Sequence, residues 1–219
     1  MPSKVGLLLS GCGIFDGSEI HEAVLTMLFL DRAGAQIVCT APDMEQVHVI
    51  DHVTLEAMDQ KRNVLVESAR IARGNIIDLQ ILDAKELDAL IIPGGFGAVK
   101  NLSDFALTGP QARVHPQVQR ILSEMLAAGK PIGALCISPA TVARALAEHD
   151  PEVTIGHDEG TAAAIEAMGG KHHTCAVNQV YVDVVHKIVT TPAYMTGSSI
   201  QQIAEGIEKL VMKVLELID

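Results

Sequence analysis

Tryptophan is absent from this chain of 219 residues, and aromatic residues make up only 3% of it. The core must therefore be built from valine, isoleucine, leucine and alanine, which is typical of buried parallel strands covered by helices. A run of about 20 apolar residues is also missing, so we predict no membrane-spanning segment. We expect no signal peptide either, because the N-terminal run MPSKVGLLLS is too short and too poorly flanked to be one.

Basic residues are scarce, with 16 lysines and arginines against 27 acidic residues and a net charge of −11. We therefore expect neither nucleic acid nor an anionic membrane as a partner, because both favour positively charged proteins. CxxC pairs are missing too, since the four cysteines are scattered as Cys12, Cys39, Cys136 and Cys175. Such a pattern is typical of reduced thiols, and we expect a cytoplasmic protein.

Short apolar runs alternate with longer amphipathic stretches along the whole chain. The predicted strands are residues 4–10, 35–41, 89–92, 132–135, 153–155, 172–177, 180–185 and 187–191, the last three at one edge of the sheet. The predicted helices are residues 19–33, 63–73, 116–128, 137–146, 161–168 and 200–217. The part at 48–59 is predicted to be a short excursion or a hairpin. Because no repeat or linker interrupts this alternation, we predict one domain over residues 1–219, a three-layer α/β sandwich with a mainly parallel sheet.

The first helix is predicted to bury an apolar stripe. Ser18 is its expected N-cap. The residues of the stripe share one face at helical spacing and are Ile20, Val24, Met27 and Leu28. Glu22 lies off this stripe in the first turn, on the side that is expected to look along the strand ends.

Cys136 stands between a short apolar run, Ile132–Leu135, and a helix rich in alanine. A nucleophile on such a strand-to-helix turn is the elbow of hydrolase-like α/β folds. The N-terminus of the following helix offers unpaired N–H groups and positive potential, which favour the reactive thiolate. The alternative is a small buried cysteine, which is where most free cysteines lie.

Three features are expected to meet at the carboxyl ends of the strands, where ligands bind in such sheets. They are the glycine-rich loop at residues 11–17 with Glu22, the Gly94-Gly95 turn, and Cys136. The N–H groups of Gly94, Gly95 and Ile137 are candidates for holding a developing oxyanion. A plain strand-to-loop turn is an equally good interpretation of the two glycines alone.

Several strings resemble a known superfamily. ALCISPA, IIPGGFGAVKNL and DGSEIHEAV are similar to the PfpI/parkinsonism-protein superfamily, which is related to class I glutamine amidotransferase domains. The resemblance implies a flavodoxin-like, class I glutamine amidotransferase-like fold and a homodimer without cofactor. It also implies Cys136 as nucleophile, Glu22 as its acidic partner, and Gly95 with Ile137 as backbone donors. The family's third position is a histidine, for which His157 is the nearest match, about one residue out of register.

Within the superfamily, SGCGIFDGSEIHEAVLT, PGGFGAVKNL and TTPAYM are most similar to a bacterial branch described as glyoxalases. The resemblance thus implies a cofactor-independent glyoxalase that converts glyoxal, or a similar small 2-oxoaldehyde, to glycolate through a Cys136 hemithioacetal. A non-catalytic thiol oxidation sensor or chaperone would use the same residues and stays open. A peptidase or amidotransferase-like hydrolase would need a histidine firmly placed beside Cys136.

Other candidate residues are weaker. Cys12 lies in the loop expected to face the site, where a packed thiol is favoured over an oxidised one. Two groups resemble metal ligands by type, and they are His48, Asp51 and His52, and His172, His173 and Cys175. We predict no metal at either, because the first lacks a further ligand pattern and strand alternation points His172 away from the other two.

Overall fold

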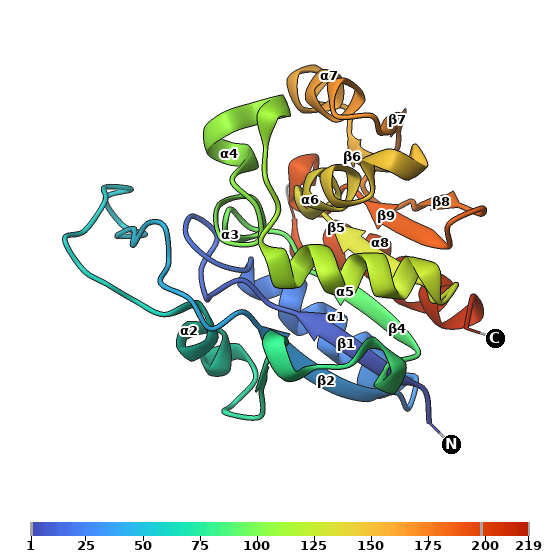
Figure 1. Cartoon of the computed structure of the whole chain (residues 1–219), viewed down its shortest axis with the longest axis horizontal. Helices are drawn as coiled ribbons and strands as arrows, with labels where there is room; N and C mark the ends of the chain where they lie inside the picture. Colours follow the sequence, from blue (N-terminus) through green and yellow to red (C-terminus); the bar gives the residue numbers. More distant parts are fainter. Residues whose placement is uncertain (1, 198, 219) are drawn as a thin grey trace.

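The computed structural model describes residues 2–197 and 199–218 and shows a seven-stranded sheet in the order β3-β2-β1-β4-β5-β9-β8 (Figure 1). Neighbouring strands run parallel, except that β8 runs antiparallel to β9. The strands are β1 (Lys4–Leu8), β2 (Gln36–Ala41), β3 (Ile77–Asp78), β4 (Ala89–Ile92), β5 (Ile132–Leu135), β8 (Tyr181–Asp183) and β9 (Ile188–Thr191). The predicted α/β fold is confirmed.

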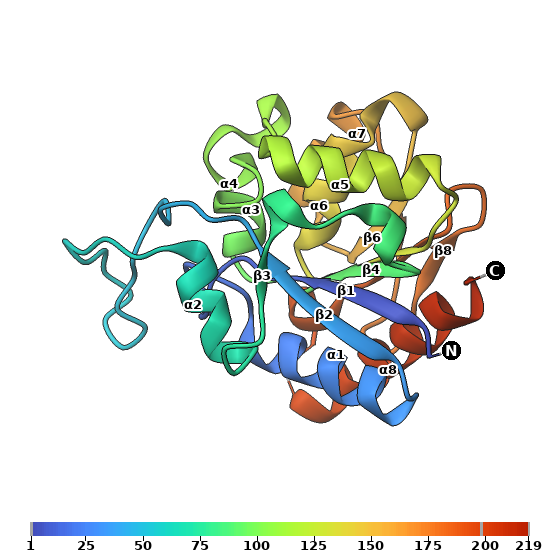
Figure 2. The ribbon, with the colours of Figure 1, turned by 60° about the horizontal axis from the view of Figure 1, so that its bottom comes forward.

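Helices cover both faces of the sheet. Figure 2 shows α1 and α8 below it and α5 and α6 above it. The helices are α1 (Ile20–Arg32), α2 (Val64–Ile71), α3 (Gly97–Lys100), α4 (Phe105–Thr108), α5 (Pro116–Ala127), α6 (Ser138–Ala145), α7 (Glu159–Ala167) and α8 (Ile200–Glu216). Short 3₁₀ turns are η1 (Leu79–Ile81), η2 (Ala84–Glu86), η3 (Gly109–Gln111), η4 (Ala147–His149) and η5 (Ala193–Met195).

The central strands contribute to two separate cores because successive side chains point to opposite faces of the sheet. Leu8 and Leu90 pack in the core that contains Ile121 of α5. Leu7 packs in the other core, which contains Leu210 of α8. The apolar side chains on both faces of the central strands are buried, which explains why these strands are continuous apolar runs in the sequence.

The prediction for the buried face of α1 is wrong. Ile20, Val24 and Leu28 are 42%, 48% and 40% exposed. The side chains that α1 buries are Glu22, Ala23, Thr26, Phe29 and Leu30. This face joins the large apolar Phe29 and Leu30 to the smaller Ala23 and Thr26, so packing against the rest of the fold decided the buried side and overrode the stripe of largest hydrophobicity.

The N-cap of α1 also differs from its prediction. Glu19 is the cap, and its Oε2 accepts the N–H of Glu22 at 2.7 Å. Ser18 is instead fully buried, and its Oγ accepts the N–H of Ser10 at 2.9 Å. This moves the helix start by one residue and places a second carboxyl beside Glu22.

The C-terminal strands depart from the predicted single edge. β6 (Glu152–Gly156) and β7 (Lys171–Thr174) form a separate two-stranded parallel sheet. β9 lies inside the main sheet between β5 and β8, so of these C-terminal strands β8 alone lies at an edge of that sheet. Strand signals in the sequence identify extended segments but do not specify their partners, which is the reason for the difference.

Residues 43–62 form an extended excursion that projects to the left of the body in Figure 1. Ile50 pairs with Ala57 in an isolated antiparallel bridge, so the segment is an irregular hairpin. His52 does not join a metal cluster; its Nε2 accepts the N–H of Phe15 at 3.3 Å. In the described part of the chain, no three His, Cys, Asp or Glu side chains group as metal ligands would. None of the described helices is long and apolar enough to cross a bilayer.

Candidate active site

Cys136 lies on the turn between β5 and α6, as predicted. Its φ of 58° is in the left-handed region, which a residue with a Cβ rarely adopts and which is typical of a nucleophile elbow. The hydroxyl of Ser138 holds this turn: Oγ accepts the N–H of Leu135 at 3.0 Å and lies 2.8 Å from the carbonyl oxygens of Ile92 and Leu135. Ser138 thus joins β4 to the elbow from a fully buried position.

The Gly94-Gly95 turn presses against the elbow. A Cβ on Gly94 would lie 2.4 Å from the Cβ of Cys136, so only glycine fits there. Gly95 has a φ of 92°, and its N–H donates to the Cys136 sulfur, as does the N–H of Ile137. Two of the three predicted backbone donors therefore surround the sulfur.

Gly94 has a different role from the one predicted. Its N–H donates to Oε2 of Glu22 at 2.8 Å, so it positions the carboxyl and is not directed at an oxyanion. The glycine turn thus donates a hydrogen bond to each of the two side chains: the N–H of Gly94 donates to Glu22, and the N–H of Gly95 donates to Cys136.

Glu22 is fully buried and hydrogen-bonded to Cys136, the pairing that the family resemblance implies. Its second oxygen, Oε1, accepts the N–H of Tyr194 at 3.2 Å. The residue therefore receives contacts from β4's turn and from the segment after β9, which are far away in the sequence. Its side chain is held on both oxygens and directed at the thiol.

Burial, followed by the charge of neighbouring Glu19, raises the pKa of Glu22 to about 8, although the amides of Tyr194 and Gly94 act in the opposite direction. Burial and then the charge of Glu22 raise the pKa of Cys136 well above its ordinary value, against the lowering effect of the Gly95 and Ile137 amides. The pKa of the Cys136 thiol is therefore raised, opposite to the lowering that the elbow and the helix N-terminus predicted. Removal from water outweighs the field of a helix N-terminus, and the two groups bind protons as a coupled pair.

The structure does not bring His157 into the site. It is exposed in the turn after β6, and it is not among the residues that line the cavity at Cys136. The small β6–β7 sheet carries this turn outward, which the sequence register could not reveal. The neighbouring Asp158 does reach the cavity wall, where its Oδ1 also accepts the N–H of Thr161 at 2.8 Å as the N-cap of α7.

Tyr194 and His21 are the residues that sequence reasoning missed. The Tyr194 hydroxyl lies 2.8 Å from Nδ1 of His21, and Tyr194 lines the cavity. It follows Ala193, whose φ of 43° is again unusual for a residue with a side chain. The string TTPAYM could have indicated Tyr194, because this residue follows the end of β9, which pairs with β5, the strand that leads to Cys136.

The candidate site opens into a cavity of about 370 Å³. Its lining residues come mainly from the glycine turn, α4, the elbow, the start of α7 and η5, and they are Ile14, Gly95, Phe96, Val99, Phe105, Ala106, Cys136, Ile137, Asp158, Thr161, Tyr194 and Met195. Cys12 is not among them; burial raises the pKa of its thiol, which packs against the core that contains Leu7.

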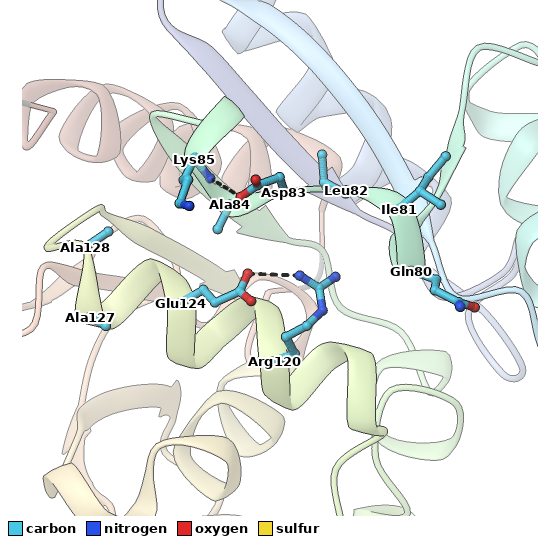
Figure 3. A pocket seen from close by; sticks show the side chains of 10 residues that line it. All are labelled: Gln80, Ile81, Leu82, Asp83, Ala84, Lys85, Arg120, Glu124, Ala127 and Ala128. Carbon is cyan, nitrogen blue, oxygen red and sulfur yellow. Dashed lines mark hydrogen bonds and ion pairs between the residues drawn. The ribbon is translucent and has the colours of Figure 1, made fainter.

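A second hollow, of about 660 Å³, lies between α5 and residues 80–85 (Figure 3). Arg120 borders it, but its guanidinium already donates to Glu124 at 2.9 Å and to the carbonyl of Leu79 at 2.7 Å. This hollow lies at the amino ends of β4 and β5, whereas ligands of such sheets bind at the carboxyl ends. The cavity at Cys136 is therefore the better candidate despite its smaller volume.

Comparisons with known proteins agree with this arrangement. No family model matches the chain. The chain is 48% identical over 225 residues to the human glutamine amidotransferase-like class 1 domain-containing protein 3, mitochondrial, covering 98% of this chain and 83% of that protein. It is 47% identical to the ES1 protein homolog, mitochondrial, of Rattus norvegicus, with 98% of this chain and 84% of that protein covered. The chain belongs to this family of ES1 and glutamine amidotransferase-like class 1 proteins.

Solved structures extend the ES1 family assignment to the fold. An isoprenoid biosynthesis protein with an amidotransferase-like domain from Ehrlichia chaffeensis has a TM-score of 0.93 and 39% identity, covering 99% of this chain and all of that one. DJ-1 of Schizosaccharomyces pombe, at 18% identity and a TM-score of 0.59 over 99% of this chain and 92% of that one, shares the fold. The predicted resemblance to class I glutamine amidotransferase-like proteins is confirmed by the human relative and the Ehrlichia protein, and the likeness to DJ-1 shows the fold that the chain shares with the PfpI/parkinsonism-protein superfamily.

The expected cytoplasmic location is contradicted, because the human and rat ES1 family relatives are both named as mitochondrial proteins. Unpaired cysteines indicate a reducing compartment but do not identify which one.

Proposed function

We propose that the chain is a cofactor-independent glyoxalase that converts glyoxal, or a similar small 2-oxoaldehyde, to the corresponding 2-hydroxy acid. The observation that carries the proposal is the hydrogen-bonded pair of Cys136 and Glu22, with the N–H groups of Gly95 and Ile137 directed at the sulfur. A nucleophile, a carboxyl of near-neutral pKa and two oxyanion donors are the groups that this reaction needs. The names of the relatives support a mitochondrial location for it.

The reaction begins when the ionised Glu22 takes the proton of the Cys136 thiol, and the sulfur adds to the aldehyde carbon as the carbonyl π bond opens. Glu22 passes this proton to the former carbonyl oxygen, which gives a hemithioacetal and restores the carboxylate. Glu22 then removes the hydrogen of that carbon as a proton, giving an enediolate, and returns it to the neighbouring carbon. As the first carbon becomes a thioester, the hydroxyl proton of the hemithioacetal moves to the oxygen of the neighbouring carbon. Water then hydrolyses the thioester to the 2-hydroxy acid and the free thiol. The net change is addition of one water, with no external oxidant or reductant.

The surroundings of Glu22 suit this shuttle. A carboxyl with a pKa of about 8 exchanges its proton readily near neutral pH, so it can take a proton from the thiol or the substrate and return it. The amides of Gly94 and Tyr194 hold both oxygens in place. The amides of Gly95 and Ile137 stabilise negative charge at the sulfur as the proton leaves it.

The two alternatives have weaker support. Peroxide-sensing cysteines are accessible thiolates of low pKa, whereas burial and the charge of Glu22 raise the pKa of Cys136. A peptidase or amidotransferase-like hydrolase needs a histidine at the thiol, and none of the residues that line the cavity is a histidine.

Turnover of glyoxal and methylglyoxal, followed by identification of the 2-hydroxy acid, tests the proposal. Cys136→Ala should abolish turnover, and Glu22→Gln should lower it by about 10²–10⁴-fold, the usual contribution of general acid–base catalysis. Cys12→Ala and Glu56→Gln are matched controls, since neither residue lines the cavity, and both should retain activity. Wild-type protein without turnover, or a Glu22→Gln variant as active as wild type, would contradict the proposal.

A further inference from the structure

We propose that the preferred substrates are 2-oxoaldehydes whose second carbonyl carries an uncharged apolar substituent of several carbons. This rests on the proposed function and names the substrate class of that same site. Four observations support it: the volume of the cavity, the apolar side chains of its wall, the presence of Asp158 as the one charged lining residue, and the contacts that Lys100 makes.

The cavity is much larger than the reacting group. A molecule of four heavy atoms such as glyoxal occupies on the order of 100 Å³ or less, because one water takes about 30 Å³ in the liquid. The cavity has about 370 Å³, within the ~300–1,000 Å³ range of pockets that enclose drug-sized ligands. With the aldehyde carbon at Cys136, most of the volume is left for the rest of the substrate.

The wall beyond the thiol is apolar. Carbon-rich side chains line it from the loop after β1, from the start of α3, from α4 and from η5, and they are Ile14, Phe96, Val99, Phe105, Ala106 and Met195. Part of Phe96 is also open to solvent, with 43% of the residue exposed. An apolar substituent would leave water on entering this wall and stabilise the complex in proportion to the area buried.

The charge of the wall selects against anions. Asp158 is the one charged residue among those that line the cavity, and its hydrogen bond to the Thr161 N–H lowers its pKa, so it is ionised at neutral pH. Lys100 follows the wall residue Val99 but is not itself a lining residue. Its Nζ lies 5.1 Å from the ring centroid of Phe96, another wall residue, and donates to the carbonyl of Phe15 at 3.1 Å, so its position is fixed by these two contacts. A substrate ending in a carboxylate or phosphate would therefore meet the charge of Asp158 and find no cation among the lining residues.

The test is a homologous series of 2-oxoaldehydes with linear alkyl substituents of increasing length. The value of kcat/KM should rise about threefold to fourfold per methylene until the cavity is filled, as expected from ~0.8 kcal/mol per buried CH₂. A compound of equal length that ends in a carboxylate should react at least about tenfold more slowly, and Asp158→Asn should narrow this gap while keeping a good N-cap for α7. A flat or falling series would overturn the inference.

A pair of adjacent variants checks where the substituent lies. Ala106→Trp would fill the cavity from α4 and should lower the ratio of kcat/KM between long and short substrates. Leu107→Trp is the matched control, because Leu107 is on the same helix, is 54% exposed and does not line the cavity. An equal ratio in both variants would contradict the placement of the substituent.

A binding measurement separates this inference from the proposed function. 2-Alkanones lack the aldehyde hydrogen that the reaction moves, yet they should protect Cys136 from iodoacetamide more strongly as their chain lengthens. Protection that rises with length, without turnover of any aldehyde, would refute the glyoxalase and support the apolar cavity. Turnover of aldehydes with no dependence on length in either assay would refute the inference and leave the glyoxalase standing.

Discussion

Two buried acids in contact make the chemistry of this protein depend on where a proton lies. Burial raises the pKa of Glu22 to about 8 and the pKa of Cys136 well above its ordinary value. The charge of Glu22 raises the pKa of Cys136 further, whereas the hydrogen bond from Cys136 lowers the pKa of Glu22. The anion of the pair can reside on oxygen, held by Gly94 and Tyr194, or on sulfur, held by Gly95 and Ile137. The proposed reaction requires a proton to move between Glu22 and Cys136, and each position of the negative charge is stabilised by its own pair of amides.

The coupling predicts opposite effects of one substitution on reactivity and on turnover. In Glu22→Gln the negative charge beside Cys136 is gone, so at pH 9 the thiolate fraction should be higher than in wild type, where Glu22 is ionised. Iodoacetamide should then label Cys136 several-fold faster in the variant, because each unit of pKa changes the thiolate fraction about tenfold. Mass-spectrometric mapping checks this, with Cys39 as internal control, since burial raises its pKa to about 11 far from Glu22. Slower labelling in the variant would contradict the coupling.

Tyr194 is predicted to assist at the second oxygen of the substrate. Tyr194 lines the cavity, its hydroxyl is hydrogen-bonded to His21, and its N–H donates to Glu22. Tyr194→Phe removes only the hydroxyl and should lower kcat roughly tenfold, the effect of one lost hydrogen bond to developing charge. The pH profile should change as well, since the contact with His21 is lost. Full activity with an unchanged profile would show that the hydroxyl has no part in the reaction.

The elbow shows how neighbouring elements hold a strained residue. Cys136 keeps a φ of 58° because its own N–H donates to the Thr191 carbonyl of β9 at 3.0 Å and because Ser138 ties the turn to β4. Gly94 completes the arrangement, since any side chain at that position would overlap the Cys136 Cβ.

Ser138→Ala should therefore destabilise the fold by about 1–3 kcal/mol, because the N–H of Leu135 loses its buried acceptor. Urea denaturation measures the change in the free energy of unfolding. Ser123→Ala on the exposed side of α5 is the control and should change it by less than about 0.5 kcal/mol. Equal stability of the two variants would show that the elbow does not depend on the hydroxyl.

For the whole molecule, the raised pKa of Glu22 predicts how stability changes with pH. Below pH 4.5, its ordinary pKa, the group is protonated in both the folded and the unfolded chain, so its contribution is fully present. As the pH rises toward about 8, the unfolded chain releases this proton and the folded chain keeps it, so the free energy of unfolding falls, by up to about 1.4 kcal/mol per pH unit.

Glu22→Gln lacks this titration, so the stability of wild type relative to the variant should decline between pH 4.5 and 8. Thermal unfolding at pH 5, 6.5 and 8 measures it. The amide of the variant faces the N–H of Gly94 or Tyr194 with one NH₂ group, but this repulsion adds a constant offset at all pH values. Parallel curves for the two proteins would contradict a buried, protonated Glu22.

The homodimer that the family resemblance implies stays a prediction, which light scattering tests.

The sequence by itself determined the sheet, the elbow at Cys136 and the glycine turn that meets it. These are local signals: apolar runs of four or five residues, a glycine pair after a strand, and a cysteine between strand and helix. Each is encoded within a few neighbouring residues and depends on backbone conformation more than on distant contacts. Glu22 could be assigned only with the family resemblance, since its own helix pattern favoured another face.

The tertiary structure decided the rest. The buried face of α1, the contact of Gly94 with Glu22, the exclusion of His157 and the Tyr194–His21 pair all arise from segments brought together across the fold. Tyr194 and Glu22 are 172 positions apart, and no local pattern links them. The shift in the pKa of Cys136 is opposite to the predicted one for the same reason. A helix N-terminus is visible in the sequence, whereas the removal of a side chain from water depends on everything that packs around it.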